Sequence, residues 1–484
     1  MKSKASLKTR TTQGLIWGGF SNGLQQLLNL FFGIWLSRIL NVEDYGVIGI
    51  LTIFTLLATT LQESGFTQAI ANKEEPTHKD YNAVFWCSSL IGIVLYLILF
   101  VAAPFIASFF QIAELTDLAR ILFLGFVISS FGTAHNAYLF KNLMVKQRAV
   151  AMLTGLLVSG SIGVLLAYQG FAYWGLALQH LSYVLCTNSL FWFFSKWRPT
   201  FDFSFAPIQQ MLPFSSRILA TKLCLHLNNH IFNLLIGKFY SRTEVGYYSQ
   251  SNKWNLMGSS VITEMVQGVA QPVFSSVVDD PLRQVRILNK LLSFAACIAF
   301  PALLGLAYIA PEFITIALTS KWAPSAYLLQ ILCVGATVIP LTNLFGNLLI
   351  SRGKSSTFMW STISFGIIQL ILALTLYPWG VRIMVIASVS LQIIWLIVWF
   401  YLVKQEIAIK WKSLIKNILP YLLYTLTSLF IASIILQGIN NLYLLFIAKL
   451  TVVAALYLTL LASFKDPVLK EFISYFKSIR LKSG

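Results

Sequence analysis

The sequence predicts an all-α membrane protein that crosses the bilayer many times, and three observations lead to this fold class. Hydrophobic residues make up 57% of the 484 residues and only 11% are charged, whereas soluble domains carry roughly 25% charged residues. The mean hydropathy is +0.74. Apolar stretches of the about 20 residues that a spanning helix needs recur along nearly the whole chain.

About fourteen such stretches are expected to be transmembrane helices. They begin near Gly14, Gly46, Tyr81, Leu118, Ala149, Ala172, Phe214, Tyr247, Leu288, Ser325, Thr357, Val381, Ile415 and Asn441. The first is too long for the core of a signal peptide, and no small-residue cleavage site follows it, so we expect it to be retained as a helix.

An internal repeat with an offset of 200 residues relates the first two stretches to the seventh and eighth. Leu27, Phe32 and Gly46 recur as Leu227, Phe232 and Gly246. The repeat predicts a six-helix lobe over residues 1–200 and a second over residues 201–404. Because each lobe has an even number of helices, a pseudo-twofold axis along the membrane normal should relate them.

Two further transmembrane helices are predicted over residues 405–464, outside the repeat. The last segment, residues 465–484, has a basic amphipathic pattern. Its apolar positions are Leu469, Phe472, Ile473, Phe476 and Ile479. We expect this tail to lie on the anionic cytoplasmic leaflet.

The net charge of +18 raises the possibility of a nucleic-acid partner. However, Lys and Arg gather in alternate connections, which include the N-terminal segment, the connection around Lys141 and the tail. This asymmetry predicts that both termini are cytoplasmic. It accounts for most of the basic charge, so no nucleic-acid partner is expected.

Polar side chains form stripes on the helices of the repeat. Residues spaced three or four apart share one helical face, and the stripe of the first helix is made of Asn22, Gln26 and Asn29. In the second copy the corresponding stripe carries Lys222, His226, Asn229 and Asn233, with Arg217 roughly a turn and a half earlier. The following helix adds Lys253, Glu264 and Gln267.

These residues are predicted to bind substrate in a shared chamber, because charges at membrane depth usually face a cavity or a partner. Lysine offers a point charge to phosphate, and amides both donate to and accept from sugar hydroxyls. The alternative is that Lys222 and Arg217 reach the cytoplasmic interface and Lys253 the outer one. Glu63 and Glu264 are predicted to take up H⁺ or Na⁺; a buried pair with Lys222 or Lys253 is the alternative.

The patterns of other chemistries are absent. His226 and His230 lack the glutamate of a metalloprotease helix, because Leu227 stands between them. The five cysteines lie apart in apolar stretches and are expected to be core residues. No outer loop is large enough to present a catalytic pair, so we expect neither an enzyme nor a metal or organic cofactor.

The first hairpin resembles a known transporter family at Leu40, Glu43, Asp44, Tyr45, Gly46 and Gly65. Further matches are Gly246, Tyr247, Tyr248, Ser249 and Gln250, followed by Gln271, Pro272, Phe274 and Ser275. The chain is similar in these motifs to the polysaccharide exporters and lipid-linked oligosaccharide flippases of the multidrug/oligosaccharidyl-lipid/polysaccharide superfamily.

This resemblance implies fourteen helices and a cationic cavity between two lobes. It also implies that an undecaprenyl-diphosphate-linked oligosaccharide moves from the cytoplasmic to the outer leaflet of the bacterial inner membrane. A polysaccharide polymerase and a chain-length regulator are its possible partners. Asn22 and Gln26 stand where peptidoglycan-precursor flippases tend to have arginines, which favours a repeat unit of lipopolysaccharide, capsule or exopolysaccharide.

Three alternatives stay open from sequence. A cation-coupled drug exporter of the same superfamily would share the fold. A membrane-embedded polysaccharide polymerase or ligase would act on the same lipid, although such enzymes usually need large external loops. A scaffold would leave the buried polar stripes unexplained.

Overall fold

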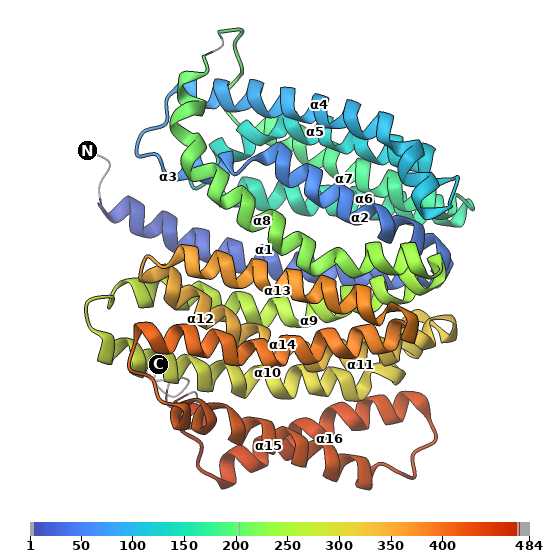
Figure 1. The fold of residues 1–484 in the computed structure, drawn as a ribbon, viewed down its shortest axis with the longest axis vertical. Helices are drawn as coiled ribbons and strands as arrows, with labels where there is room; N and C mark the ends of the chain where they lie inside the picture. The colour runs from blue at the N-terminus through green and yellow to red at the C-terminus, as the bar shows by residue number, and fades with distance from the viewer. Residues whose placement is uncertain (1–3, 203, 472–473, 475–484) are drawn as a thin grey trace. The chain divides into compact units, whose positions relative to one another are not determined.

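The computed structural model describes residues 4–202, 204–471 and 474 as a helical protein (Figure 1). No β-strand occurs within these ranges. Ten helical segments are long and apolar enough to cross a membrane, judged by length and composition. The predicted class, an all-α multi-pass membrane protein, is therefore confirmed. The number of fourteen spans stays a prediction.

Contacts divide the chain into two compact units, the first ending at Gly246 and the second beginning at Tyr247. The helices of the first unit are α1 (Lys4–Ile39), α2 (Val42–Glu63), α3 (Phe66–Asn72), α4 (His78–Phe110), α5 (Leu115–Lys141), α6 (Val145–Tyr168), α7 (Ala172–Phe194) and α8 (Ala206–Phe239). Helix α9 (Arg242–Ser275) begins in the first unit and continues into the second.

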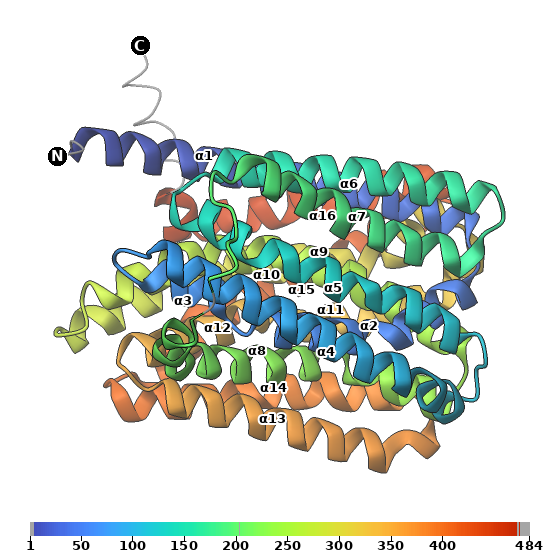
Figure 2. The same cartoon turned by 90° about the horizontal axis from the view of Figure 1, so that it is seen from above.

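The second unit continues with α10 (Pro281–Leu318), the 3₁₀ turn η1 (Ser320–Trp322), α11 (Ala323–Ala336), α12 (Ile339–Ser351), α13 (Ser355–Leu376), the 3₁₀ turn η2 (Tyr377–Trp379), α14 (Val381–Glu406), α15 (Trp411–Ile435) and α16 (Leu442–Ser463). Helices α13 and α14 pack side by side, as both views show (Figures 1 and 2). Helices α15 and α16 pack against each other and against α10.

Helix α8 belongs to the first unit by its contacts, because it packs against α2, α3 and α4. The predicted lobes over residues 1–200 and 201–404 place this helix in the second half of the repeat, and those lobe boundaries stay a prediction. The predicted amphipathic tail lies mostly outside the described residues.

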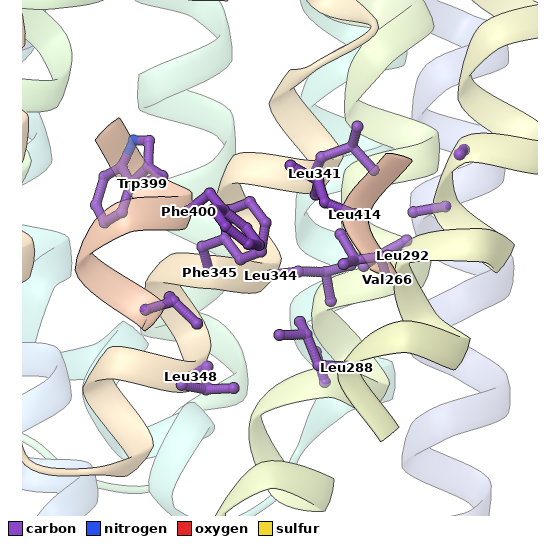
Figure 3. Close-up of a cluster of buried hydrophobic side chains, with 14 of the residues drawn as sticks. Val266, Leu288, Leu292, Leu341, Leu344, Phe345, Leu348, Trp399, Phe400 and Leu414 are labelled. Atoms are coloured by element: carbon purple, nitrogen blue, oxygen red, sulfur yellow. The ribbon is translucent and has the colours of Figure 1, made fainter. Parts of the chain in front are cut away.

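Buried leucine and aromatic side chains make a core of the second unit, shown in Figure 3. Phe345 of α12 and Phe400 of α14 meet edge to face, with ring centroids 6.2 Å apart. Leu288 and Leu292 bring α10 to this cluster, and Leu414 brings α15. The two C-terminal helices are thereby joined to the rest of the second unit by apolar packing.

Two helices of the first unit begin with the same local device, a capping box. The Asn41 backbone N–H donates to Asp44 Oδ2 at 2.8 Å at the start of α2. The Thr77 N–H donates to Asp80 Oδ2 at 2.7 Å at the start of α4. These carboxylates satisfy backbone donors that the first helical turn leaves unpaired.

The two repeat glycines lie in a reciprocal backbone contact. A Cβ atom added to Gly46 would lie 1.8 Å from the carbonyl oxygen of Arg242, and one added to Gly246 would lie 2.2 Å from that of Val42. Since 242 and 246 are 42 and 46 shifted by 200, each copy of the repeat makes the same contact with the other. Reciprocity of this kind is the signature of a twofold relation.

Candidate functional site

The polar stripe of α8 runs from a half-buried end to a buried end. Lys222 and His226 are half-buried, and Asn229 is exposed. Asn233 is buried, and its Nδ2 donates to the carbonyl oxygen of Gly49 in α2 at 3.3 Å. The side chain of Arg217 lies outside the described residues, although its backbone is part of α8. The stripe is thus fixed to α2 at one end and accessible at the other.

Lys222 forms an ion pair with Glu63, with Nζ and Oε2 3.5 Å apart. The side chains are 32% and 36% exposed, so a ligand can reach both groups. Of the alternatives open from sequence, the structure shows a pair between Lys222 and Glu63. Glu264 is exposed and makes no ion pair with any described residue.

Glu63 is the last residue of α2, at a break in the helix. Ser64 and Gly65 follow with φ of 45° and 70°, and α3 begins at Phe66. A carboxylate at a helix C-terminus is disfavoured by the helix dipole, and the ammonium of Lys222 offsets this cost. Helix breaks at membrane depth are where transporters commonly bind substrates and ions.

The stripe of α1 continues a face that is buried further along the helix. Asn22, Asn29 and Leu36 are seven residues apart in turn, so they share one face. Leu36 is buried in a cluster with Val164 of α6, whereas Asn22 and Asn29 are exposed and Gln26 is half-buried. This face of α1 is therefore packed against other helices at its apolar end and is accessible at its polar end.

In the second unit, Lys253 of α9 is half-buried, and its Nζ lies 5.6 Å from the ring centroid of Trp254. Within the described ranges it has no carboxylate partner. Gln267 is exposed on the same helix. Lys253 is thus a cation able to accept an anionic ligand without first losing an ion pair.

No group of three or more potential metal ligands occurs in the part of the chain that the structure describes. His226 and His230 lie one turn apart on α8. The Nδ1 atom of His230 is buried and has no hydrogen-bond partner there. The two rings add polarity to the stripe.

A second polar site, which the sequence reasoning missed, lies inside the first unit. It is a pocket of about 280 Å³ between α2, α5, α6 and α7, and Arg148, Asn136, His180, Tyr183 and Glu63 are among its lining residues. By its place in the sequence, Arg148 belongs with the basic connection around Lys141. The available signal was the spacing of His180, Tyr183 and Thr187, three and four residues apart on an apolar helix.

Comparison with known proteins identifies the family. Residues 35–327 match the model of a family described as "Polysaccharide biosynthesis protein". This match covers more than half of the chain. The chain belongs to this family. The resemblance seen in its short motifs is thereby confirmed.

The sequence is similar to that of the lipopolysaccharide biosynthesis protein WzxC of Escherichia coli (strain K12). It is 24% identical over 355 residues, which cover 72% of this chain and 71% of the relative. The sequence similarity therefore extends over most of the length of both proteins.

Two solved structures share the fold. The lipid II flippase MurJ in an inward closed conformation has a TM-score of 0.78 at 16% identity, and the alignment covers 94% of this chain and all of that one. An inward-facing multidrug resistance MATE family transporter of the MOP superfamily has a TM-score of 0.64 at 18% identity, covering 79% and 94%. The family member described here thus has a MOP transporter fold.

Proposed function

We propose that this protein is a flippase that moves an undecaprenyl-diphosphate-linked oligosaccharide from the cytoplasmic to the outer leaflet by alternating access. The cargo is a repeat unit of lipopolysaccharide, capsule or exopolysaccharide. The observation that carries the proposal is the accessible ammonium of Lys222 on the α8 stripe, within a family of polysaccharide biosynthesis. A diphosphate needs cations, and its glycan needs amides and hydroxyls.

The roles of the site residues follow from their chemistry. Lys222, Lys253 and Arg217 would hold the diphosphate. The amides Asn22, Gln26, Asn29, Asn229 and Gln267 would contact sugar hydroxyls, and His226 would add a further polar contact. Asn233, held by Gly49, would position the stripe. The protein would act in the bacterial inner membrane with both termini in the cytoplasm. A polymerase and a chain-length regulator would use its product on the outer side of that membrane.

The alternatives differ in what they transport or make. A cation-coupled drug exporter has support from the fold, since a multidrug transporter shares it. The family match favours the glycan instead. A polymerase or ligase would need a reactive site outside the helices, and a scaffold would have no use for an accessible Lys222. We therefore place the protein among transporters and not among enzymes.

A flipping assay tests the proposal. Purified protein in liposomes is expected to bring a fluorescent undecaprenyl-diphosphate oligosaccharide within reach of an external quencher. Lys253→Ala removes a charge-assisted contact of about 1.5–3 kcal/mol, so we expect a rate roughly 10- to 100-fold lower. Lys79→Ala, at an exposed residue of α4, is the matched control.

Transport of a cationic drug without movement of the labelled lipid would identify a drug exporter and refute the flippase. An unchanged rate for Lys253→Ala would remove this residue from the substrate site.

Coupling to H⁺ or Na⁺ is a separate expectation, assigned to Glu63 and Glu264. An imposed gradient of the coupling ion should accelerate flipping in the wild type. Glu63→Gln should abolish this acceleration, because the neutral amide cannot exchange a proton or balance a cation. Flipping that ignores both gradients would exclude both carboxylates from the mechanism.

A further inference from the structure

The pocket inside the first unit contains the guanidinium of Arg148, which forms no ion pair with any residue that the structure describes. Arg148 of α6 donates from Nε to Asn136 Oδ1 of α5 at 3.0 Å. Its Cζ lies 4.9 Å from the ring centroid of Phe140. No carboxylate among the described residues is within ion-pair distance of the guanidinium. Asn136 thus orients the group and leaves its two terminal nitrogens to other partners.

Helix α7 turns a polar face toward the same pocket. His180, Tyr183 and Thr187 lie on this face, and Asn188 lies beside it. Polar and ionisable side chains are costly within membrane helices, and they usually face the bundle interior, a water-filled cavity or one another. The pocket therefore combines one oriented guanidinium with amide, hydroxyl and imidazole groups.

Glycines of the neighbouring helices make room for these side chains. A Cβ atom on Gly132 of α5 would lie 1.5 Å from Asn188 Oδ1. One on Gly155 of α6 would lie 2.2 Å from Thr187 Oγ1. Any larger residue at either position would displace a polar group of α7. The polar lining therefore depends on the glycines that let α5 and α6 pack closely against α7.

The charges that line the pocket would be balanced by a ligand with a single negative charge. Its lining contains two charged residues, Arg148 and Glu63. The carboxylate of Glu63 is already balanced by Lys222, 3.5 Å away. One positive charge remains, on a planar fork that binds a carboxylate in two parallel hydrogen bonds.

The volume limits the size of the ligand. About 280 Å³ is just below the roughly 300–1,000 Å³ typical of small-molecule sites. A single sugar ring matches such a space better than a whole oligosaccharide does. A diphosphate carries more negative charge than the pocket can balance.

We propose that this pocket is a subsite for one acidic sugar, with its carboxylate on Arg148 and its hydroxyls on the α7 face. The subsite deepens the proposed function and rests on it: it would select glycans that contain a uronic acid or a similar acidic residue. Its position beside Glu63 connects it with the ion pair at the end of α2.

Binding of glucuronate to the purified full-length protein tests the subsite directly. Saturation-transfer NMR should show saturable binding of glucuronate and much weaker binding of glucose. Arg148→Gln should weaken glucuronate binding at least roughly tenfold, because the charged fork is lost. Lys146→Gln should leave it unchanged, since this nearby lysine is exposed and lies over Trp17.

A second variant guards against misfolding of Arg148→Gln. Tyr183→Phe keeps the ring and removes the hydroxyl, so glucuronate binding should fall roughly fivefold, as for one neutral hydrogen bond. Equal binding by wild type and Arg148→Gln would overturn the subsite, as would no binding by the wild type. Inorganic phosphate that binds as well as glucuronate would also overturn it, because the site would then recognise phosphate and not an acidic sugar.

Flipping of two labelled lipids separates this proposal from the flippase itself. Arg148→Gln should slow a lipid-linked glycan containing glucuronate about tenfold and leave a neutral glycan unaffected. Equal slowing of both glycans would contradict a sugar-selective subsite. If the wild type flips neither lipid, the proposed function fails, and the binding measurement still decides the subsite.

Discussion

Lys222→Gln is expected to abolish surface polysaccharide while the protein stays inserted in the membrane. The substitution removes the accessible ammonium of the α8 stripe and with it a charge-assisted contact of about 1.5–3 kcal/mol to a diphosphate. Flipping should fall roughly 10- to 100-fold. Surface glycan in intact cells and protein abundance in the membrane fraction are the two measurements.

The single variant also leaves the carboxylate of Glu63 without its partner, and breaking a buried pair in this way costs about 3–5 kcal/mol. Half-exposure of Glu63 lowers that cost, and a second variant removes it. Glu63→Gln with Lys222→Gln is neutral and nearly isosteric. It should insert and remain as stable as the wild type, yet export no glycan.

Normal export by the double variant would show that the pair has only a structural role. Lys79→Gln changes an exposed lysine of α4 and should leave export unchanged. Glu63→Gln alone frees Lys222 and should retain binding of the lipid-linked glycan.

Gly46→Ala and Gly246→Ala are expected to destabilise the protein, each by roughly 1–3 kcal/mol. The atoms that meet the new methyl groups are the backbone carbonyls of Arg242 and Val42. A backbone carbonyl cannot rotate away as a side chain does, so the chain segments must separate. The melting temperature of the purified protein in detergent should fall for both variants.

Gly23→Ala is the control, because a Cβ atom there meets no atom within 4 Å. Since the two repeat glycines share one contact, the double variant should cost less than the sum of the single variants. Additive effects would mean that the two contacts are independent, against the twofold relation.

The internal repeat can be predicted from the sequence, but the contact between its two copies cannot. The 200-residue offset was visible in Leu27, Phe32 and Gly46, but the glycines could not be identified as a contact. Sequence periodicity gives the face on which a residue lies and not the segment that this face meets. The reciprocal contact of Gly46 and Gly246 required the backbone positions.

The candidate site divides in the same way. The stripes of α1 and α8 follow from three- and four-residue spacing, and the structure leaves Asn22, Lys222 and His226 exposed or half-buried. The sequence alone does not decide whether Lys222 pairs with Glu63 or with Glu264, because both glutamates are far from it along the chain. Arg148 was missed because a basic residue near a connection also fits a cytoplasmic loop.

The amino-acid sequence by itself determined the membrane class, the helical segments, the repeat and the polar faces, since hydropathy and helical periodicity are properties of neighbouring residues. Only the tertiary structure decided that Glu63 ends α2 at a break beside Lys222, and that Arg148 faces the polar side of α7. These relations join residues 32 to 159 positions apart, and packing between helices, not local pattern, brings them together.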